Sequence, residues 1–136
     1  MKIIFTCFFI CVMMSSLAVA ADSYPLHAAI QSGKPSRVRA ELRSSRLNQR
    51  NYEDMTPLMV AARYDRSTSA GIVLETDVLV DEETSTYGIT ALMLVAHNSH
   101  TNIVHQLLQA GANPVLRDAS NCTAKKHSAN SSLKCV

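Results

Sequence analysis

The chain has 136 residues, a length that suits one domain of ordinary size. Thirteen Lys and Arg stand against eleven Asp and Glu, so neither nucleic acid nor an anionic membrane is expected as an obligate partner. Trp is absent, and all three Phe lie near the start. The rest of the chain therefore cannot build its core on large aromatic side chains.

The first twenty residues have the features of a secretory signal peptide. Lys2 is positive, residues 3–14 are an uncharged apolar run, and residues 15–20 end in the small-x-small pattern that signal peptidase accepts. We expect cleavage after Ala20, which leaves residues 21–136 as one domain. An uncleaved membrane anchor is the alternative, but the apolar run is short for a hydrocarbon core of about 30 Å. No membrane span is expected after cleavage.

A signal peptide places the mature chain in an oxidising compartment, so we expect a periplasmic or secreted protein. The single Lys and the Ala-Val-Ala-Ala junction are more typical of a bacterial signal, which favours the periplasm. Two N-glycosylation sequons begin at Asn121 and Asn130, but that number matches chance in a chain rich in Ser and Thr. The sequons therefore do not decide the export route.

Two cysteines, Cys122 and Cys135, remain after cleavage. An even pair in an exported chain favours a disulfide bond, which would close a loop of fourteen residues and hold the C-terminal end on the fold. The alternative is a frayed tail with two free thiols.

Three segments of the mature chain have a similar start and recur at a regular spacing. They begin at residues 24, 56 and 90 and read Tyr-Pro-Leu-His-Ala-Ala, Thr-Pro-Leu-Met-Val-Ala-Ala and Thr-Ala-Leu-Met-Leu-Val-Ala. A weaker copy, Thr-Ala-Lys-Lys-His, begins at residue 123. The second positions of the four segments are 32, 34 and 33 residues apart. Such a period indicates stacked copies of one structural unit.

Each copy favours a pair of short helices. Thr56 can cap the free amides of a helix start, and Pro57 follows where its fixed φ fits. In the third copy an apolar stripe runs over residues 103–108, and Gly111 stands where a left-handed residue would end the helix. One such pair cannot bury its own apolar face, so the copies must stack to form a core.

The period near 33 and the Thr-Pro-Leu-His-x-Ala-Ala pattern resemble the ankyrin repeat, over about residues 22 to 129. The resemblance implies an all-α solenoid of stacked helix pairs with hairpin loops. Its three repeats would cover about 22–51, 52–84 and 85–117, followed by a degenerate cap over 118–136. The second repeat matches least, because residues 69–71 replace the usual Ile-Val pair and residues 77–85 lack a Gly-Ala turn.

Two charged segments are interpreted as solvated surface. Residues 34–50 hold six basic residues and one acid, which is typical of an exposed capping helix, with a dock for an anionic partner as the alternative. Residues 77–83 hold four acidic residues in the irregular loop of the second repeat. They lack the oxygen spacing and turn glycine of a known calcium loop, so no calcium site is expected.

The polar residues form no pattern for catalysis or metal binding. Three histidines, His97, His100 and His105, point in different directions in the ankyrin register, whereas zinc needs converging ligands. His27 occupies the histidine position of the repeat, where we expect a structural hydrogen bond. No serine has a Gly-x-Ser-x-Gly setting or an obvious base. We therefore expect a monomer with no enzyme activity, cofactor or metal.

The resemblance implies a scaffold that binds a protein partner through a concave groove of first helices and hairpin tips. The partner would be another envelope protein; alternatively, the chain is an immunity or inhibitor protein that neutralises a toxic enzyme in the same compartment. Tyr and Arg often dominate interface energies, although two of the tyrosines could instead pack on neighbouring hairpins. The register places these residues in the groove: Tyr52, Glu53, Met55, Arg63, Tyr64, Thr86, Tyr87, Ile89, His97 and Asn98.

Overall fold

The computed structural model describes residues 23–43 and 45–128, and within them it has helices, turns and loops but no strand. The predicted signal peptide and Cys135 lie outside these residues. None of the described helices is long and apolar enough to cross a membrane. The described helices are α2 (Pro25–Gln31), α3 (Pro35–Glu41), α4 (Pro57–Arg63), α5 (Ser67–Leu74), α6 (Ala91–Asn98), α7 (Thr101–Gln109) and α8 (Ala124–Ser128).

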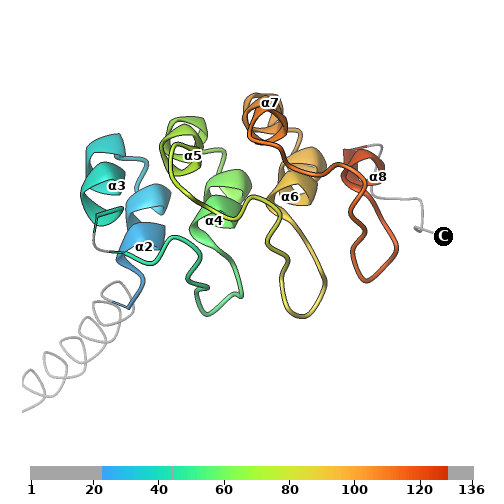
Figure 1. Ribbon diagram of the computed structural model, residues 1–136, viewed down its shortest axis with the longest axis horizontal. Coiled ribbons are helices and arrows are strands. Elements are labelled where there is room, and N and C mark those ends of the chain that lie inside the picture. Colours follow the sequence, from blue (N-terminus) through green and yellow to red (C-terminus); the bar gives the residue numbers. More distant parts are fainter. Residues whose placement is uncertain (1–22, 44, 129–136) are drawn as a thin grey trace, which may run out of the picture.

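The helices form two stacked rows (Figure 1). Helices α2, α4, α6 and α8 follow one another in an inner row, and α3, α5 and α7 form an outer row. Each of the first three inner helices also packs against the outer helix that follows it in the chain. The loops that connect one pair to the next project from one side as long hairpins (Figure 1). The predicted all-α solenoid of helix pairs is therefore confirmed for the described residues.

Threonine caps fix the starts of the two central inner helices. The Oγ1 atoms of Thr56 and Thr90 each accept a hydrogen bond of 3.3 Å, from the backbone N–H of Met59 and Met93 respectively. Both threonines are 1% exposed, so the capping atoms lie inside the stack, where unpaired amides would be costly. At the other end of the third pair, Gly111 has φ +91°, which confirms the predicted left-handed position.

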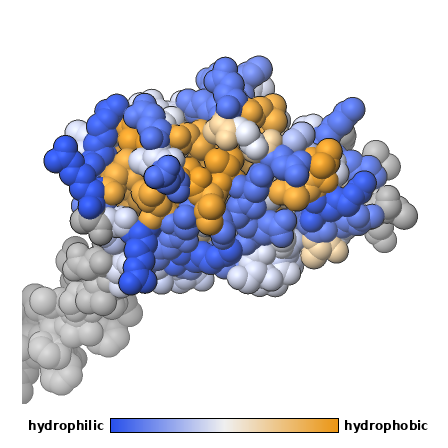
Figure 2. All heavy atoms as spheres, viewed as in Figure 1, coloured by the Kyte–Doolittle hydropathy of each residue, from blue (hydrophilic) through white to orange (hydrophobic). Residues whose placement is uncertain are grey.

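One hydrophobic cluster runs through the stack. Helix α4 has neighbours on both sides, and its residues from Pro57 to Ala62 are all buried. In α7 the apolar stripe divides, because Ile103 and Leu107 are fully buried whereas Leu108 is 44% exposed. On the face shown in Figure 2, hydrophobic residues gather over the helical layer and hydrophilic residues border them.

The second repeat forms a complete helix pair despite its weak match to the repeat pattern. Ser69 and Ala70 are buried on α5. A Cβ atom on Gly71 would lie 3.3 Å from Nε2 of Gln106 on α7. The small residues that break the expected Ile-Val pattern therefore let α5 approach α7 closely.

The acidic loop of the second repeat is not simply a solvated insertion, which corrects the interpretation from sequence. Oδ1 of Asp81 accepts a 2.9 Å hydrogen bond from the backbone N–H of Asn113 in the next loop. Oε2 of Glu82 pairs with Nη2 of Arg50 in the preceding loop at 2.7 Å. The acidic loop therefore bonds to the loops before and after it. Arg50 takes part in this contact, so it is not one of the simply solvated basic residues of segment 34–50.

Candidate functional site

The tips of the three hairpin loops lie at residues 51–55, 84–89 and 118–122, and side chains shape them in similar ways. Oδ1 of Asn51 accepts hydrogen bonds of 3.0 Å from the backbone N–H groups of Glu53 and Met55. In the third tip, Oδ1 of Asp118 accepts hydrogen bonds from the backbone N–H groups of Ser120 and Cys122, at 2.9 and 2.8 Å. In the second tip, Oγ1 of Thr84 accepts a hydrogen bond from the backbone N–H of Ile89. These side chains hold the tips in defined conformations.

Hydrogen bonds also join neighbouring tips. The carboxylate of Asp54 accepts from the backbone N–H of Ser85 and from its hydroxyl group. The backbone N–H of Ala119 donates to the carbonyl oxygen of Tyr87 at 2.9 Å. The hydrogen bond from the Ser85 N–H is the main cause that lowers the pKa of Asp54, helped by Arg50. The tips therefore form a continuous row.

Tyrosines stand exposed on the first two tips. Tyr52 is 78% exposed and Tyr87 is 63% exposed, so neither ring packs extensively on a neighbouring hairpin. The alternative that these rings are structural packing groups is therefore wrong. Glu53 and Thr86 beside them are exposed as well.

The end of α4 adds a connected group of side chains. Nη1 of Arg63 lies 3.2 Å from Oε2 of Glu53. The guanidinium carbon of Arg63 lies 5.7 Å from the centroid of the Tyr64 ring, and Tyr64 is 40% exposed. The ion pair and the cation–π contact thus link Arg63 to the first tip and to Tyr64.

Met55 does not belong to this surface, which corrects its assignment to the groove. Its side chain is in the core, with the residue only 5% exposed. Its carbonyl oxygen accepts a 2.9 Å hydrogen bond from Nε2 of His27. Met55 therefore supports the first tip from within the core.

The end of α6 borders a small hollow of about 190 Å³. Its floor is apolar, and its lining residues are Ile89, Met93, Leu94, His97 and His127. The His97 and His127 rings meet edge to face, with centroids 6.3 Å apart. His97 and its neighbour Asn98 are exposed and Ile89 is half-buried, so the hollow is an apolar depression bordered by two imidazole rings. The repeat pattern does not predict a place for His127 at this hollow, because α8 belongs to the degenerate cap.

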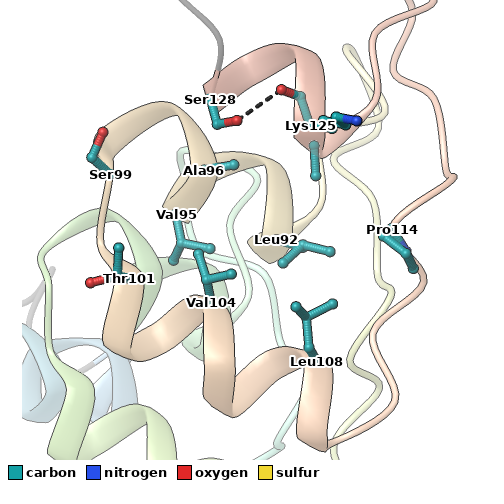
Figure 3. Close-up of a pocket in the computed structure, with 11 residues that line it drawn as sticks. Leu92, Val95, Ala96, Ser99, Thr101, Val104, Leu108, Pro114, Lys125 and Ser128 are labelled. Atoms are coloured by element: carbon teal, nitrogen blue, oxygen red, sulfur yellow. Dashed lines mark hydrogen bonds between the residues drawn. The ribbon is translucent and has the colours of Figure 1, made fainter.

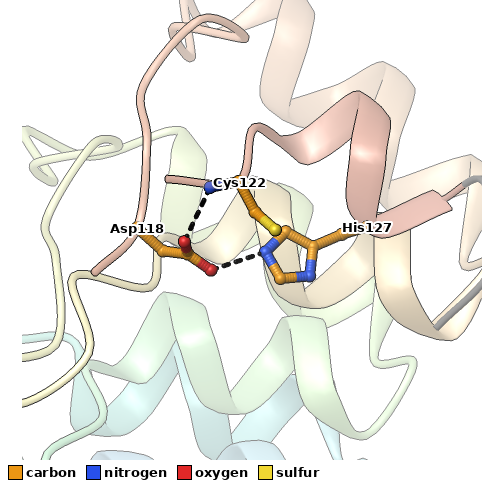
Figure 4. A group of neighbouring side chains, drawn as sticks. All are labelled: Asp118, Cys122 and His127. Atoms are coloured by element: carbon orange, nitrogen blue, oxygen red, sulfur yellow. Dashed lines mark hydrogen bonds and ion pairs between the residues drawn. The ribbon is translucent and has the colours of Figure 1, made fainter. Parts of the chain in front are cut away.

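His127 is held by a hydrogen bond with Asp118. Its Nε2 lies 2.9 Å from Oδ2 of Asp118 (Figure 4). Burial opposes ionisation of Asp118, but hydrogen bonds from the backbone N–H groups of Cys122 and Ser120 and from His127 outweigh burial and lower its pKa. The pair therefore joins α8 to the third tip.

Asp118, Cys122 and His127 also offer three metal-ligand atoms within 4.8 Å of one another. The sulfur of Cys122 is already engaged in a further interaction, so we do not assign a metal to this trio. The described structure does not bring the three histidines His97, His100 and His105 together as a ligand group. Nδ1 of His100 instead donates to the carbonyl oxygen of Ala62 at 2.8 Å.

His27 makes folding stability depend on pH. Burial lowers its pKa below the ordinary value of 6.5, partly offset by hydrogen bonds to the backbone of Met55 and Gln49. The unfolded chain therefore binds a proton more readily, and stability should fall as pH drops below 6.5. We expect His27→Gln to flatten this dependence in urea denaturation at a series of pH values. An equal slope in both proteins would contradict this assignment.

Of the predicted groove residues, eight are exposed and Ile89 is half-buried, and we call these nine the groove surface: Tyr52, Glu53, Arg63, Tyr64, Thr86, Tyr87, Ile89, His97 and Asn98. Residues 87–119 match the family model of the ankyrin repeat. This match covers α6, α7 and the chain after α7 as far as the start of the third tip, which is close to the third repeat expected from the sequence. With the stacked helix pairs, the match identifies the described fold as an ankyrin-repeat helical solenoid.

Proposed function

We propose that this protein is a scaffold that binds another protein through its groove surface. The observation that carries the proposal is the row of linked tips with exposed tyrosines, the first of which is joined to Arg63 through Glu53. Tyrosine and arginine bury large area at interfaces while keeping polar tips for hydrogen bonds. Because the tips are already ordered, binding would cost little conformational entropy.

The charge of this surface favours a partner with a mixed rather than strongly charged face. Arg63 is already paired with Glu53. The hollow beside His97 adds an apolar position that a protruding side chain of the partner could fill. By contrast, Arg39 and Arg43 stand exposed around the outer helix α3, outside the groove surface.

Substitutions on the groove surface and around helix α3 test which of the two surfaces binds the partner. Tyr64→Ala and Arg63→Ala should each weaken partner binding by more than about 1 kcal/mol, since each removes a large exposed contact. Arg39→Ala and Arg43→Ala are the matched controls and should change affinity only through a salt-dependent term. Titration calorimetry gives the affinities, and thermal melting shows that each variant is folded. Loss of binding in the α3 variants alone would place the site on the basic cap instead.

We also propose that the protein is exported to the periplasm and begins at Ala21 after processing. The apolar segment and the small residues before the junction support this proposal. Amino-terminal sequencing of the exported protein should start at Ala21. Retention of Met1 in the exported form would show that the segment is not cleaved.

The identity of the partner decides between two roles in that compartment. A scaffold should co-purify with a resident envelope protein. An immunity protein should co-purify with a toxic enzyme and block its activity. Affinity purification of the processed chain, followed by mass spectrometry and an activity assay on the captured protein, separates the two. The Tyr64→Ala variant serves as the negative control in both cases.

A further inference from the structure

Hollows outside the groove surface differ in the chemistry of their linings. One of about 360 Å³ lies between α6, α7 and α8, and aliphatic side chains such as Leu92 and Val104 line it (Figure 3). Such a lining offers few directed hydrogen bonds to an occupant. Another hollow, of about 150 Å³, lies at the start of α5 and is lined by Gly33, Pro35 and residues 65–69. The side chains of residues 65–69 are all polar, so this second hollow can select a charged ligand.

The start of α5 lacks the cap that the two central inner helices have. Thr56 and Thr90 each accept a hydrogen bond from a free amide of α4 and α6, whereas Arg66 stands at that position before α5 and provides no such bond. The first N–H groups of a helix have no partner within the helix. Those of residues 67–69 are therefore left without an acceptor in the described part of the chain.

A buried hydroxyl group faces the same hollow. Ser69 is 2% exposed and lines the hollow, so the small area that stays accessible opens into it. A helical Cα–Cβ bond tilts toward the start of its helix, which directs this side chain toward the free amides. The hydroxyl group has no hydrogen-bond partner within residues 23–43 and 45–128. Because a buried polar group without a partner is costly, this serine indicates a ligand that supplies the missing bond.

The guanidinium group of Arg66 is held beside these donors. Its Nη2 donates a 2.9 Å hydrogen bond to the carbonyl oxygen of Gln31. A Cβ atom on Gly33 would lie 3.2 Å from Nη1 and 3.5 Å from Nε, so the group lies close over this glycine. Neither Nη1 nor Nε bonds to another of the described residues. Both atoms therefore stay available to a ligand in the hollow.

We propose that this hollow binds a small phosphate-type oxyanion. The N–H groups of residues 67–69, the hydroxyl group of Ser69 and the guanidinium group of Arg66 can all donate hydrogen bonds to it, and charge strengthens such bonds. The start of a helix adds a positive potential. The carboxylate of Asp65 opposes the anion and limits its affinity. The site is separate from the groove surface, since none of the groove residues lines it.

NMR titration of the isotope-labelled processed protein with inorganic phosphate tests the site, with chloride at equal ionic strength as the control. We expect saturable shifts at the amides of residues 67–69 and at the Nε–H of Arg66. Ser69→Ala should weaken phosphate binding about five-fold or more, since it removes a hydrogen bond to a charged ligand. Alanine suits a helix, so the variant should stay folded. Shifts that do not saturate, or that chloride reproduces, would overturn the proposal.

A variant of Asp65 should have the opposite effect. Asp65 has φ +53°, a conformation that Asn also adopts, so Asp65→Asn should keep the turn. Loss of the negative charge should tighten phosphate binding about three-fold. Arg43→Gln is the control, because Arg43 is exposed beyond the other end of α3 and should leave the affinity unchanged. Equal affinities in the unsubstituted, Ser69→Ala and Asp65→Asn proteins would overturn the assignment.

Vesicles of phosphatidylglycerol distinguish a free ion from the phosphate group of a lipid. Phosphate binding without sedimentation on the vesicles assigns a free oxyanion. Sedimentation that added phosphate and Ser69→Ala both reduce assigns a lipid headgroup, and either result supports the site. Sedimentation that neither of them changes, together with a protein that phosphate does not titrate, would overturn it.

Discussion

Replacing Leu107 with Ala is expected to lower the free energy of unfolding by about 2 to 5 kcal/mol, as for other buried large-to-small changes. Leu107 is fully buried on α7 within the hydrophobic cluster. Its removal would leave a void where α7 packs on α6 and α5. Because stability in a repeat array depends on contacts between neighbours, the loss should spread to the whole short stack.

The adjacent leucine provides the control for this substitution. Leu108→Ala changes the same side chain on the same helix, but at a position that is 44% exposed, so it should cost clearly less. Urea denaturation of both variants measures the difference. An unchanged midpoint for Leu107→Ala would show that α7 packs through a different face.

Replacing Cys122 with Ser is expected to lower stability by as much as about 3 kcal/mol if the proposed bridge to Cys135 forms. The bridge would close fourteen residues and restrict the unfolded chain. Ser is close to Cys in size, and the backbone N–H at this position stays bonded to Asp118, so little else should change.

Reduction gives the matched comparison for the cysteine variant. The unsubstituted protein in a strong reductant should be destabilised to nearly the same extent as Cys122→Ser under oxidising conditions. The variant itself should not respond to the reductant. Two titratable thiols in the unreduced, denatured mature protein would contradict the bridge.

The helices could be predicted because their causes are local. Thr56 and Pro57 stand next to each other in the sequence, and together they define a helix start that the structure confirms. Gly111 likewise marks the end of the third pair through a backbone conformation that glycine adopts readily. The repeat pattern also predicts a structural hydrogen bond for His27, and the structure confirms it.

The contacts that link neighbouring hairpin loops could not be predicted, because they depend on pairs about one repeat apart. Arg50 meets Glu82 across 32 positions, and Asp54 meets Ser85 across 31. The period indicates that such positions face each other, but it does not say which polar side chains will bond. The assignment of Met55 to the groove is wrong for a related reason, since adjacent side chains along a hairpin can lie on the surface and in the core.

Photo-crosslinking tests the central claim that the partner binds the groove surface. A benzoylphenylalanine is placed at Tyr64, at Tyr87 or, as the control, at Arg39 on the outer helix α3, and the processed protein is irradiated with its co-purified partner. We predict crosslinks to the same partner from positions 64 and 87 and none from position 39. Crosslinks from position 39 alone would contradict the account and move the binding site to the basic cap.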